Sequence, residues 1–205
     1  MATTVARRRP HAASLLLLLP VVITLSGCIR LGLPSSPSFY ERVANEPGEH
    51  AHALVMRGDE LMQAGEFAKA RRHYARAAQA APDNALPYIG MVRADLEAQN
   101  HARALRVARQ ARALFAADVE VQLLEATALM STGQLSEAAA AIDAITPVFD
   151  QHRALIARAR GDLAYRSSNY SEAMELWRAS LAIDPIQKDL DRRIQSVAQW
   201  LAAQQ

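Results

Sequence analysis

Four segments of the chain share one arrangement of small, aromatic and proline residues, repeated about every 34 residues. Small residues let two helices approach closely, an aromatic ring fills the space between them, and a proline cannot continue a helix. A period of this length predicts an array of stacked repeats, each of which buries its apolar face against its neighbours. The first segment, residues 51–84, shows the arrangement most completely, with Gly58, Gly65, Phe67, Ala70, Tyr74, Ala77 and Pro82.

The second segment, residues 85–118, is a degenerate copy of the first. Ala108 stands where the first segment has Tyr74, and Gln99 stands where it has Gly65. The missing ring predicts a smaller core in this segment. We therefore expect this repeat to be the least stable of the four.

The third and fourth segments, residues 119–150 and 154–187, follow the same pattern. The fourth matches after a shift of one residue, so that Trp177 takes the place of Tyr74. After this shift even Asp162 reproduces Asp59. A last segment, residues 188–205, has apolar residues along one side and predicts an amphipathic helix that covers the final repeat.

Taken together, these spacings resemble the tetratricopeptide repeat (TPR), a unit of two antiparallel helices. The resemblance implies an all-α fold: a TPR-type α-solenoid of about four helix-turn-helix repeats, spanning residues 49–187, plus a C-terminal capping helix. A composition rich in Ala, Leu, Arg and Glu favours helix independently. The alternative is an Ala-rich helical bundle whose periodicity is accidental.

The N-terminus carries a second pattern: Arg7, Arg8 and Arg9, an apolar run from Leu15, and then Leu25, Ser26, Gly27 and Cys28. This order resembles a bacterial lipoprotein signal peptide that ends in a lipobox. The resemblance implies that residues 1–27 are removed and that Cys28 carries covalent diacylglyceryl and acyl lipid. Two alternatives are an uncleaved transmembrane anchor, because the uncharged run approaches the length of a span, and twin-arginine export.

Residues 28–48 contain Pro34, Pro37 and Pro47 and are expected to form a flexible linker behind the lipid. Ile29 follows the cysteine, whereas an aspartate there is associated with inner-membrane retention. We therefore expect a cell-envelope protein, lipid-anchored to the outer membrane and facing the periplasm, with the bilayer as one partner.

Cleavage would also change the charge of the chain. It removes three arginines and no acidic residue, so the formal charge moves from +2 to −1. This balance gives no reason to expect a nucleic-acid partner. Since Cys28 is the only cysteine, the mature chain could form no disulfide.

No motif in the sequence predicts catalysis. There is no HExxH, no phosphate-binding glycine loop and no GxSxG. His50 and His52 are close in sequence but have no third ligand in view. We therefore expect no enzyme activity, no metal and no cofactor apart from the lipid on Cys28.

Arginines recur every three residues on one predicted helix, at Arg103, Arg106, Arg109 and Arg112. They could bind an anionic partner such as a lipid headgroup. Steps of three residues drift around a helix, however, so the four side chains do not share one narrow face. A solvated surface is the better interpretation.

In the family that the chain resembles, the first helix of each repeat lines a concave groove that holds an extended peptide or a partner helix. Family members that bind chaperone tails have a lysine and an asparagine where this chain has Val55 and Asp59, so a chaperone-tail clamp is not expected. Ile89, Leu96 and Leu123 could instead pack between repeats. By phase, the positions expected to face the groove are Val55, Asp59, Met62, Ile89, Arg93, Leu96, Leu123, Thr127, Met130, Arg158, Asp162 and Tyr165.

The function that this resemblance implies is a membrane-anchored scaffold that binds a protein partner and aids assembly of an envelope machine, such as a pilus, a secretion system or the outer-membrane biogenesis machinery. A recruiter or regulator of cell-wall enzymes is the first alternative. A glycan-processing or cell-wall enzyme with an unrecognised site is the second.

Overall fold

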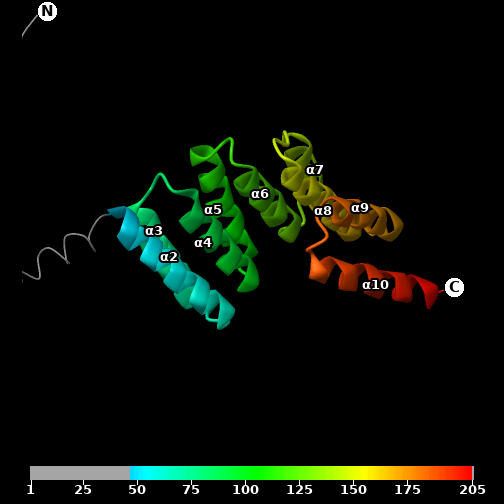
Figure 1. The fold of residues 1–205 in the computed structure, drawn as a ribbon, viewed down its shortest axis with the longest axis horizontal. Coiled ribbons are helices and arrows are strands. Elements are labelled where there is room, and N and C mark those ends of the chain that lie inside the picture. The colour runs from blue at the N-terminus through cyan, green and yellow to red at the C-terminus, as the bar shows by residue number, and fades with distance from the viewer. Residues whose placement is uncertain (1–46, 205) are drawn as a thin grey trace, which may run out of the picture. The chain divides into compact units, whose positions relative to one another are not determined.

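The computed structural model describes residues 47–204, in which every regular element is a helix (Figure 1). The predicted all-α TPR-type solenoid is confirmed. The predicted signal peptide, the lipobox residues Leu25, Ser26 and Gly27, the lipidated Cys28 and most of the predicted linker lie outside the described residues. Within the described part, no helix combines the length and the apolar character needed to span a bilayer.

The described helices pack as consecutive pairs. Within pairs, α2 packs on α3, α4 on α5, α6 on α7 and α8 on α9. The first helices of neighbouring pairs also contact one another, and α10 packs on α9. Figure 1 shows the pairs following one another in chain order. The helices are α2 (Pro47–Gln63), α3 (Phe67–Ala80), α4 (Ala85–Glu97), α5 (His101–Leu114), α6 (Val119–Ser131), α7 (Leu135–Asp143), α8 (Asp150–Arg166), α9 (Tyr170–Ile183) and α10 (Lys188–Ala202).

The first of these helices starts inside the segment expected to be linker. α2 begins at Pro47, whereas the linker was expected to extend through Gly48. Proline is tolerated in the first turn of a helix because its missing N–H has no partner there, and Glu49 adds a favourable negative charge at that end. Pro47 therefore opens a helix and does not separate the helix from the linker.

The turn inside each pair has the same backbone form. Its left-handed position is held by Gly65 (φ 73°) and Gly133 (φ 80°) in two pairs. Gln99 (φ 58°) and Ser168 (φ 64°) hold it in the other two, although side chains other than glycine rarely adopt this conformation. The turn is therefore preserved in the two repeats that lack the glycine.

Aromatic rings fill the space between helices at two of the pairs. Tyr74 is buried between Gly58 of α2 and Gly90 of α4, where a Cβ built on either glycine would lie within 2.6 Å of a ring carbon. Trp177 of α9 is fully buried against Gly161 of α8 in the same way. The small residues are therefore required by the rings that they contact, as the spacing predicts.

The second pair has no ring at the equivalent position, because Ala108 stands there. Aliphatic side chains, among them Val92 and Leu105, fill this part of the core. At one edge Tyr88 and Phe115 pack together, with ring centroids 5.5 Å apart. The core of this pair is thus built differently, with its rings at one edge and none at the position of Tyr74.

A buried carboxylate joins three helices near this point. Asp95 of α4 has no exposed surface. It accepts hydrogen bonds from Nε of Arg71 on α3 at 3.0 Å and from Nε of Arg103 on α5 at 2.7 Å. Leu61 and Leu129 occupy the same repeat position, so Asp95 is a charged residue in an otherwise apolar row. Because a buried charge is costly when unpaired, the two arginines make this arrangement tolerable.

Candidate functional site

The first helices of the pairs carry four rows of equivalent residues on one side of the repeat array. Counting by the repeat period, row 1 is His52, Leu86, Glu120 and Leu155; row 2 is Val55, Ile89, Leu123 and Arg158; row 3 is Asp59, Arg93, Thr127 and Asp162; and row 4 is Met62, Leu96, Met130 and Tyr165. Rows 2 to 4 contain all the residues that the sequence places in the groove. Two hollows and a C-terminal cleft open along these rows.

The N-terminal hollow has a volume of about 560 Å³. Its walls are mainly apolar, with polar groups at Asp59 and His52 and a charged boundary at Arg93 and Glu120. It contains Val55, Asp59, Met62, Ile89 and Arg93 from the predicted set. Its lining residues are His52, Val55, Met56, Asp59, Met62, Gln63, Tyr74, Leu86, Ile89, Gly90, Arg93 and Glu120.

The central hollow has a volume of about 500 Å³. Its apolar part comes from leucines on α6 and α8, and its charged groups are two arginines and two carboxylates. It contains Arg93, Thr127, Arg158 and Asp162 from the predicted set, together with Leu123. Its lining residues are Arg93, Glu120, Leu123, Leu124, Thr127, Gln151, Leu155, Arg158, Ala159 and Asp162.

Arg93 and Glu120 belong to both hollows and form an ion pair between α4 and α6. Both side chains are about half exposed, so solvent screens the pair and its contribution to stability is small. A partner crossing from one hollow to the other could therefore exchange its own charged groups with this pair at little cost.

Three predicted residues lie elsewhere. Met130 is only 3% exposed and packs in the core, because α6 has first helices on both sides of it. It offers no surface to a partner, which corrects its assignment to the groove. Leu96 is half-buried and packs against the same core without lining either hollow. Tyr165 lines the C-terminal cleft beside α10.

Row 1 was missed by the sequence analysis, which counted only three positions on each first helix. Glu120 borders both hollows, Leu155 lines the central one, and His52 and Leu86 line the N-terminal one. Counting one helical turn further toward the N-terminus of each first helix, from row 2, identifies all four row 1 residues from the sequence.

The two row 3 aspartates share one structural role. The phenol of Tyr74 donates a hydrogen bond of 2.6 Å to Oδ1 of Asp59. The indole Nε1–H of Trp177 donates to Oδ1 of Asp162 at 3.0 Å. In both repeats the groove carboxylate therefore accepts a hydrogen bond from the ring of the second helix, which explains why Asp162 reproduces Asp59.

Burial and the hydrogen bond to Asp59 together raise the pKa of the Tyr74 phenol far above its usual value. The nearby negative charge of the Asp59 carboxylate acts in the same direction, whereas Arg93 lowers the pKa. The phenol therefore stays protonated and acts as a donor, with no acid–base role near neutral pH.

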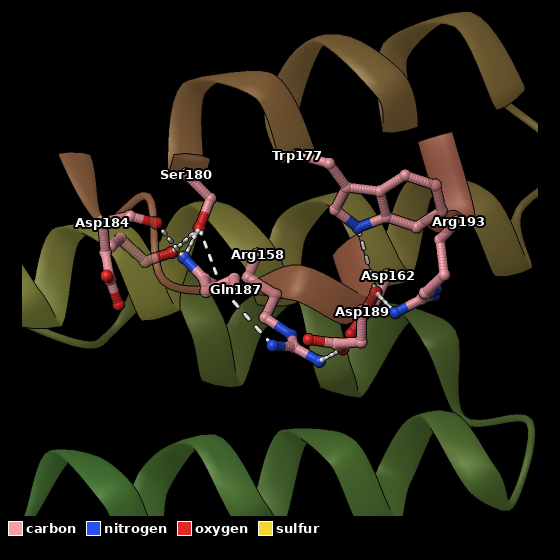
Figure 2. Close-up of polar contacts among 9 residues, drawn as sticks. Arg158, Asp162, Trp177, Ser180, Asp184, Gln187, Asp189 and Arg193 are labelled. Carbon is pink, nitrogen blue, oxygen red and sulfur yellow. Dashed lines mark hydrogen bonds and ion pairs between the residues drawn. The ribbon is translucent and has the colours of Figure 1, made fainter. Parts of the chain in front are cut away.

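Polar contacts fix α10 at the end of the groove (Figure 2). Arg158 of α8 pairs with Asp189 of α10 at 2.5 Å, and Arg193 of α10 pairs with Asp162 at 2.8 Å. Gln187, which is buried, donates a hydrogen bond of 3.0 Å to the hydroxyl of Ser180 on α9. Side chains of α10 thus complete the charged groups of the preceding repeat.

Three of the four arginines on α5 bind carboxylates of neighbouring helices. These arginines were expected from the sequence to form a solvated surface, and the structure adds that most of them are paired. Arg103 pairs with Asp95 of α4. Arg109 and Arg112 pair with carboxylates of α7 and α6, Glu137 at 3.1 Å and Glu125 at 3.7 Å. This arginine run links helices, and it leaves little unpaired charge for an anionic partner.

The described residues contain no group of three or more His, Cys, Asp or Glu side chains placed to hold a metal ion. The ionisable groups that line the N-terminal and central hollows are the ion pairs and ring acceptors above, together with Tyr74 and His52. What this arrangement offers is a binding surface with apolar floors and a charged boundary.

Comparisons with known proteins agree with the geometry. Residues 51–84 and 95–163 each match a family profile described as Tetratricopeptide repeat. No curated protein sequence matches the chain.

Several solved structures are similar in fold. TTC0263, a thermophilic TPR protein of Thermus thermophilus, is 18% identical over 79% of this chain and 88% of its own, with a TM-score of 0.63. The APC/C hetero-tetramer Cut9–Hcn1 is 16% identical over 79% of this chain, with a TM-score of 0.64, and this chain spans 32% of that one. A MamA RS-1 double mutant is 14% identical over 77% of this chain and 97% of its own, with a TM-score of 0.53.

Proposed function

Because this chain contains tetratricopeptide repeats and folds as a TPR-type α-solenoid, we propose that it is a protein–protein interaction scaffold anchored to a membrane of the bacterial cell envelope. The partner is a peptide or helix that lies in the groove formed by the N-terminal and central hollows. The observation that carries the proposal is the continuous run of the two hollows along four first helices, with Arg93 and Glu120 between them.

The size and chemistry of the hollows support a peptide as the occupant. Each hollow falls in the volume range of ordinary binding sites. Apolar side chains such as Leu155 and Val55 can take apolar side chains of the partner, while Arg93 and Arg158 can bind its carboxylates. Methionines at positions 56 and 62 adapt to irregular shapes.

The membrane anchor rests on the sequence. Lipidation of Cys28 by diacylglyceryl and an acyl chain would supply the two or more chains that stable anchoring requires. The linker between Cys28 and α2 would set how far the groove reaches from the membrane. We propose the outer membrane, facing the periplasm, on the basis of Ile29.

Within the envelope we propose a role in assembling a larger machine. Among the structures of similar fold is a hetero-tetramer, so helical arrays of this kind do occur inside assemblies. Recruitment or regulation of a cell-wall enzyme would use the same groove, and the identity of the bound partner separates the two roles.

The groove is tested by crosslinking in cells, followed by purification and mass spectrometry. We expect the pair Arg93→Glu and Leu155→Glu to reduce recovery of the main partner at least about tenfold, with helicity unchanged. Arg106→Glu, at an exposed position of α5, is the matched charge reversal and should leave recovery unchanged. Equal recovery with the groove pair would place the partner on another surface.

The anchor is tested by fractionation with detergent phase separation. Cys28→Ala should move the protein from the detergent phase to the aqueous phase. Partitioning that stays the same without the thiol would remove the lipoprotein proposal while leaving the groove proposal intact.

A further inference from the structure

The C-terminal cleft, between α8, α9 and α10, is lined by aromatic rings. Four rings contact one another in series: Trp177 with Tyr165 at 5.7 Å, Tyr165 with Tyr170 at 5.5 Å, and Tyr170 with Trp200 at 4.9 Å between centroids. The last two pairs meet nearly edge to face, at 68° and 66°. Tyr165 and Trp200 are 41% and 46% exposed, so the cleft presents ring faces and edges to solvent.

The cleft consists of two adjoining hollows of about 250 and 240 Å³ that share Tyr165, Ser196 and Val197. One ends at Trp200 and the other at Arg192 and Arg193. Neither shares a lining residue with the N-terminal or the central hollow. Tyr165 of α8 and both Ser196 and Val197 of α10 line the two hollows, so α10 forms one wall of the cleft.

Each polar side chain that lines the cleft can donate a hydrogen bond, and the phenols and the Ser196 hydroxyl can also accept one. The phenols of Tyr165 and Tyr170 and the indole of Trp200 donate no side-chain hydrogen bond to another described residue. At the far end, the guanidinium of Arg193 stacks 4.4 Å from the Trp177 ring and pairs with Asp162 (Figure 2). Arg192 is exposed, and no carboxylate among the described residues pairs with it.

We propose that this cleft binds a proline-rich segment of the partner protein in the polyproline II conformation, with an acidic residue of that segment on Arg192. A polyproline II chain makes no internal hydrogen bonds, so its carbonyl groups accept bonds from the free phenol and indole donors. Proline rings fit between aromatic rings that meet at steep angles, as in other aromatic-lined grooves for such segments. An exposed guanidinium binds a carboxylate in two-point geometry.

The same observations disfavour two other occupants. The lining has no amide and no carboxylate, so the acceptors it offers to a saccharide's hydroxyl groups are limited to the phenol oxygens and the Ser196 hydroxyl. A helix has its carbonyl groups already bonded internally, so it would leave the phenol and indole donors unused. The extended proline-rich segment satisfies both the rings and the donors.

The inference rests on the proposed function, because it names the chemistry of one part of the bound partner. Its experiment is direct titration of the purified full chain with a capped oligoproline peptide that ends in a pair of glutamates, followed by calorimetry and tryptophan fluorescence. We expect saturable binding that Trp200→Ala weakens at least about tenfold. Arg192→Glu should weaken binding of this peptide but not of the same peptide ending in lysines.

Phe149→Ala removes an exposed ring outside the cleft and should leave binding unchanged. Because Trp200 also packs on Tyr170, its alanine variant can lose some stability, so binding is measured well below its thermal midpoint, with the fold checked by circular dichroism. Tyr165→Phe, which keeps the ring and removes one donor, should weaken binding less than Trp200→Ala.

Three results would overturn the inference: no binding of the peptide, equal binding by Trp200→Ala, or binding of a chitin oligosaccharide in place of the peptide. In each case, partner recovery that still depends on Arg93 and Leu155 would leave the proposed function standing.

Discussion

Gly58→Ala tests the packing logic of the repeats most sharply. The Cβ added at Gly58 would lie 2.5 Å from Cε1 and 2.7 Å from Cζ of Tyr74. The ring has little room to move, because Gly90 of the next repeat also packs closely against it and the phenol is held by Asp59. The substitution therefore forces either the helices apart or the ring out of its slot.

Two opposing terms decide the magnitude. Alanine is favoured over glycine inside a helix by about 1 kcal/mol. Overpacking of a core costs about 1–3 kcal/mol, and displacing the phenol from the Asp59 carboxylate costs a further 1.5–3 kcal/mol or so if that bond is lost. We expect a net loss of about 1–3 kcal/mol, which corresponds to roughly 2–4 °C in Tm for each kcal/mol in a chain of this size.

The assay is urea and thermal unfolding followed by circular dichroism. Gly48→Ala is the matched control, because it lies in the same helix with no atom within 4 Å of the new Cβ, and it should be neutral or slightly stabilising. In a Tyr74→Leu background the cost of Gly58→Ala should shrink, since the two sites are in contact. A Gly58→Ala protein as stable as the wild type would refute the reasoning.

Three further predictions concern stability. Removing both arginines around Asp95 (Arg71→Ala with Arg103→Ala) should cost about 3–5 kcal/mol in urea unfolding, whereas Asp95→Leu, which restores the residue found at this position in two other repeats, should cost clearly less; the reverse order would contradict the buried-charge argument. The pKa of the Tyr74 phenol is raised by folding, so stability should be complete below about pH 10 and fall as the pH rises above it, and Tyr74→Phe should make the fall shallower by about one proton; parallel alkaline profiles would show that the phenol ionises equally in both states. Gln99→Gly should stabilise the chain by up to about 1 kcal/mol and Gly133→Gln should destabilise it, because both positions have positive φ; equal melting temperatures would argue against strain at this turn.

The repeat period made most of the fold predictable. Gly58 and Tyr74 are 16 residues apart on two helices, so their contact follows directly from antiparallel pairing. The positive-φ turn also recurs at the expected spacing, but its presence at Gln99 and Ser168 could not be read from residue type. Backbone geometry there is imposed by the packing of the flanking helices.

The site was less predictable because the exposure of a side chain depends on the helices packed around it as well as on its position in the repeat. Met62 and Met130 are equivalent by count, yet Met62 lines a hollow at the first repeat while Met130 is covered on both sides. Asp95 was missed by the sequence analysis because the equivalent positions of other repeats hold apolar core residues. A charged residue at such a core position, with arginines on the neighbouring helices, is the sequence signal for a buried ion pair. Glu120 was missed only because the count stopped one turn short.

The most direct test of the central claim is site-specific photocrosslinking in living cells. A photoreactive amino acid at position 155, in the central hollow, should give a discrete crosslinked protein band that Arg93→Glu diminishes. The same amino acid at position 110, on the exposed side of α5, should give none. Equal adducts at the two positions, or adducts only at position 110, would contradict a groove that holds a partner along the first helices.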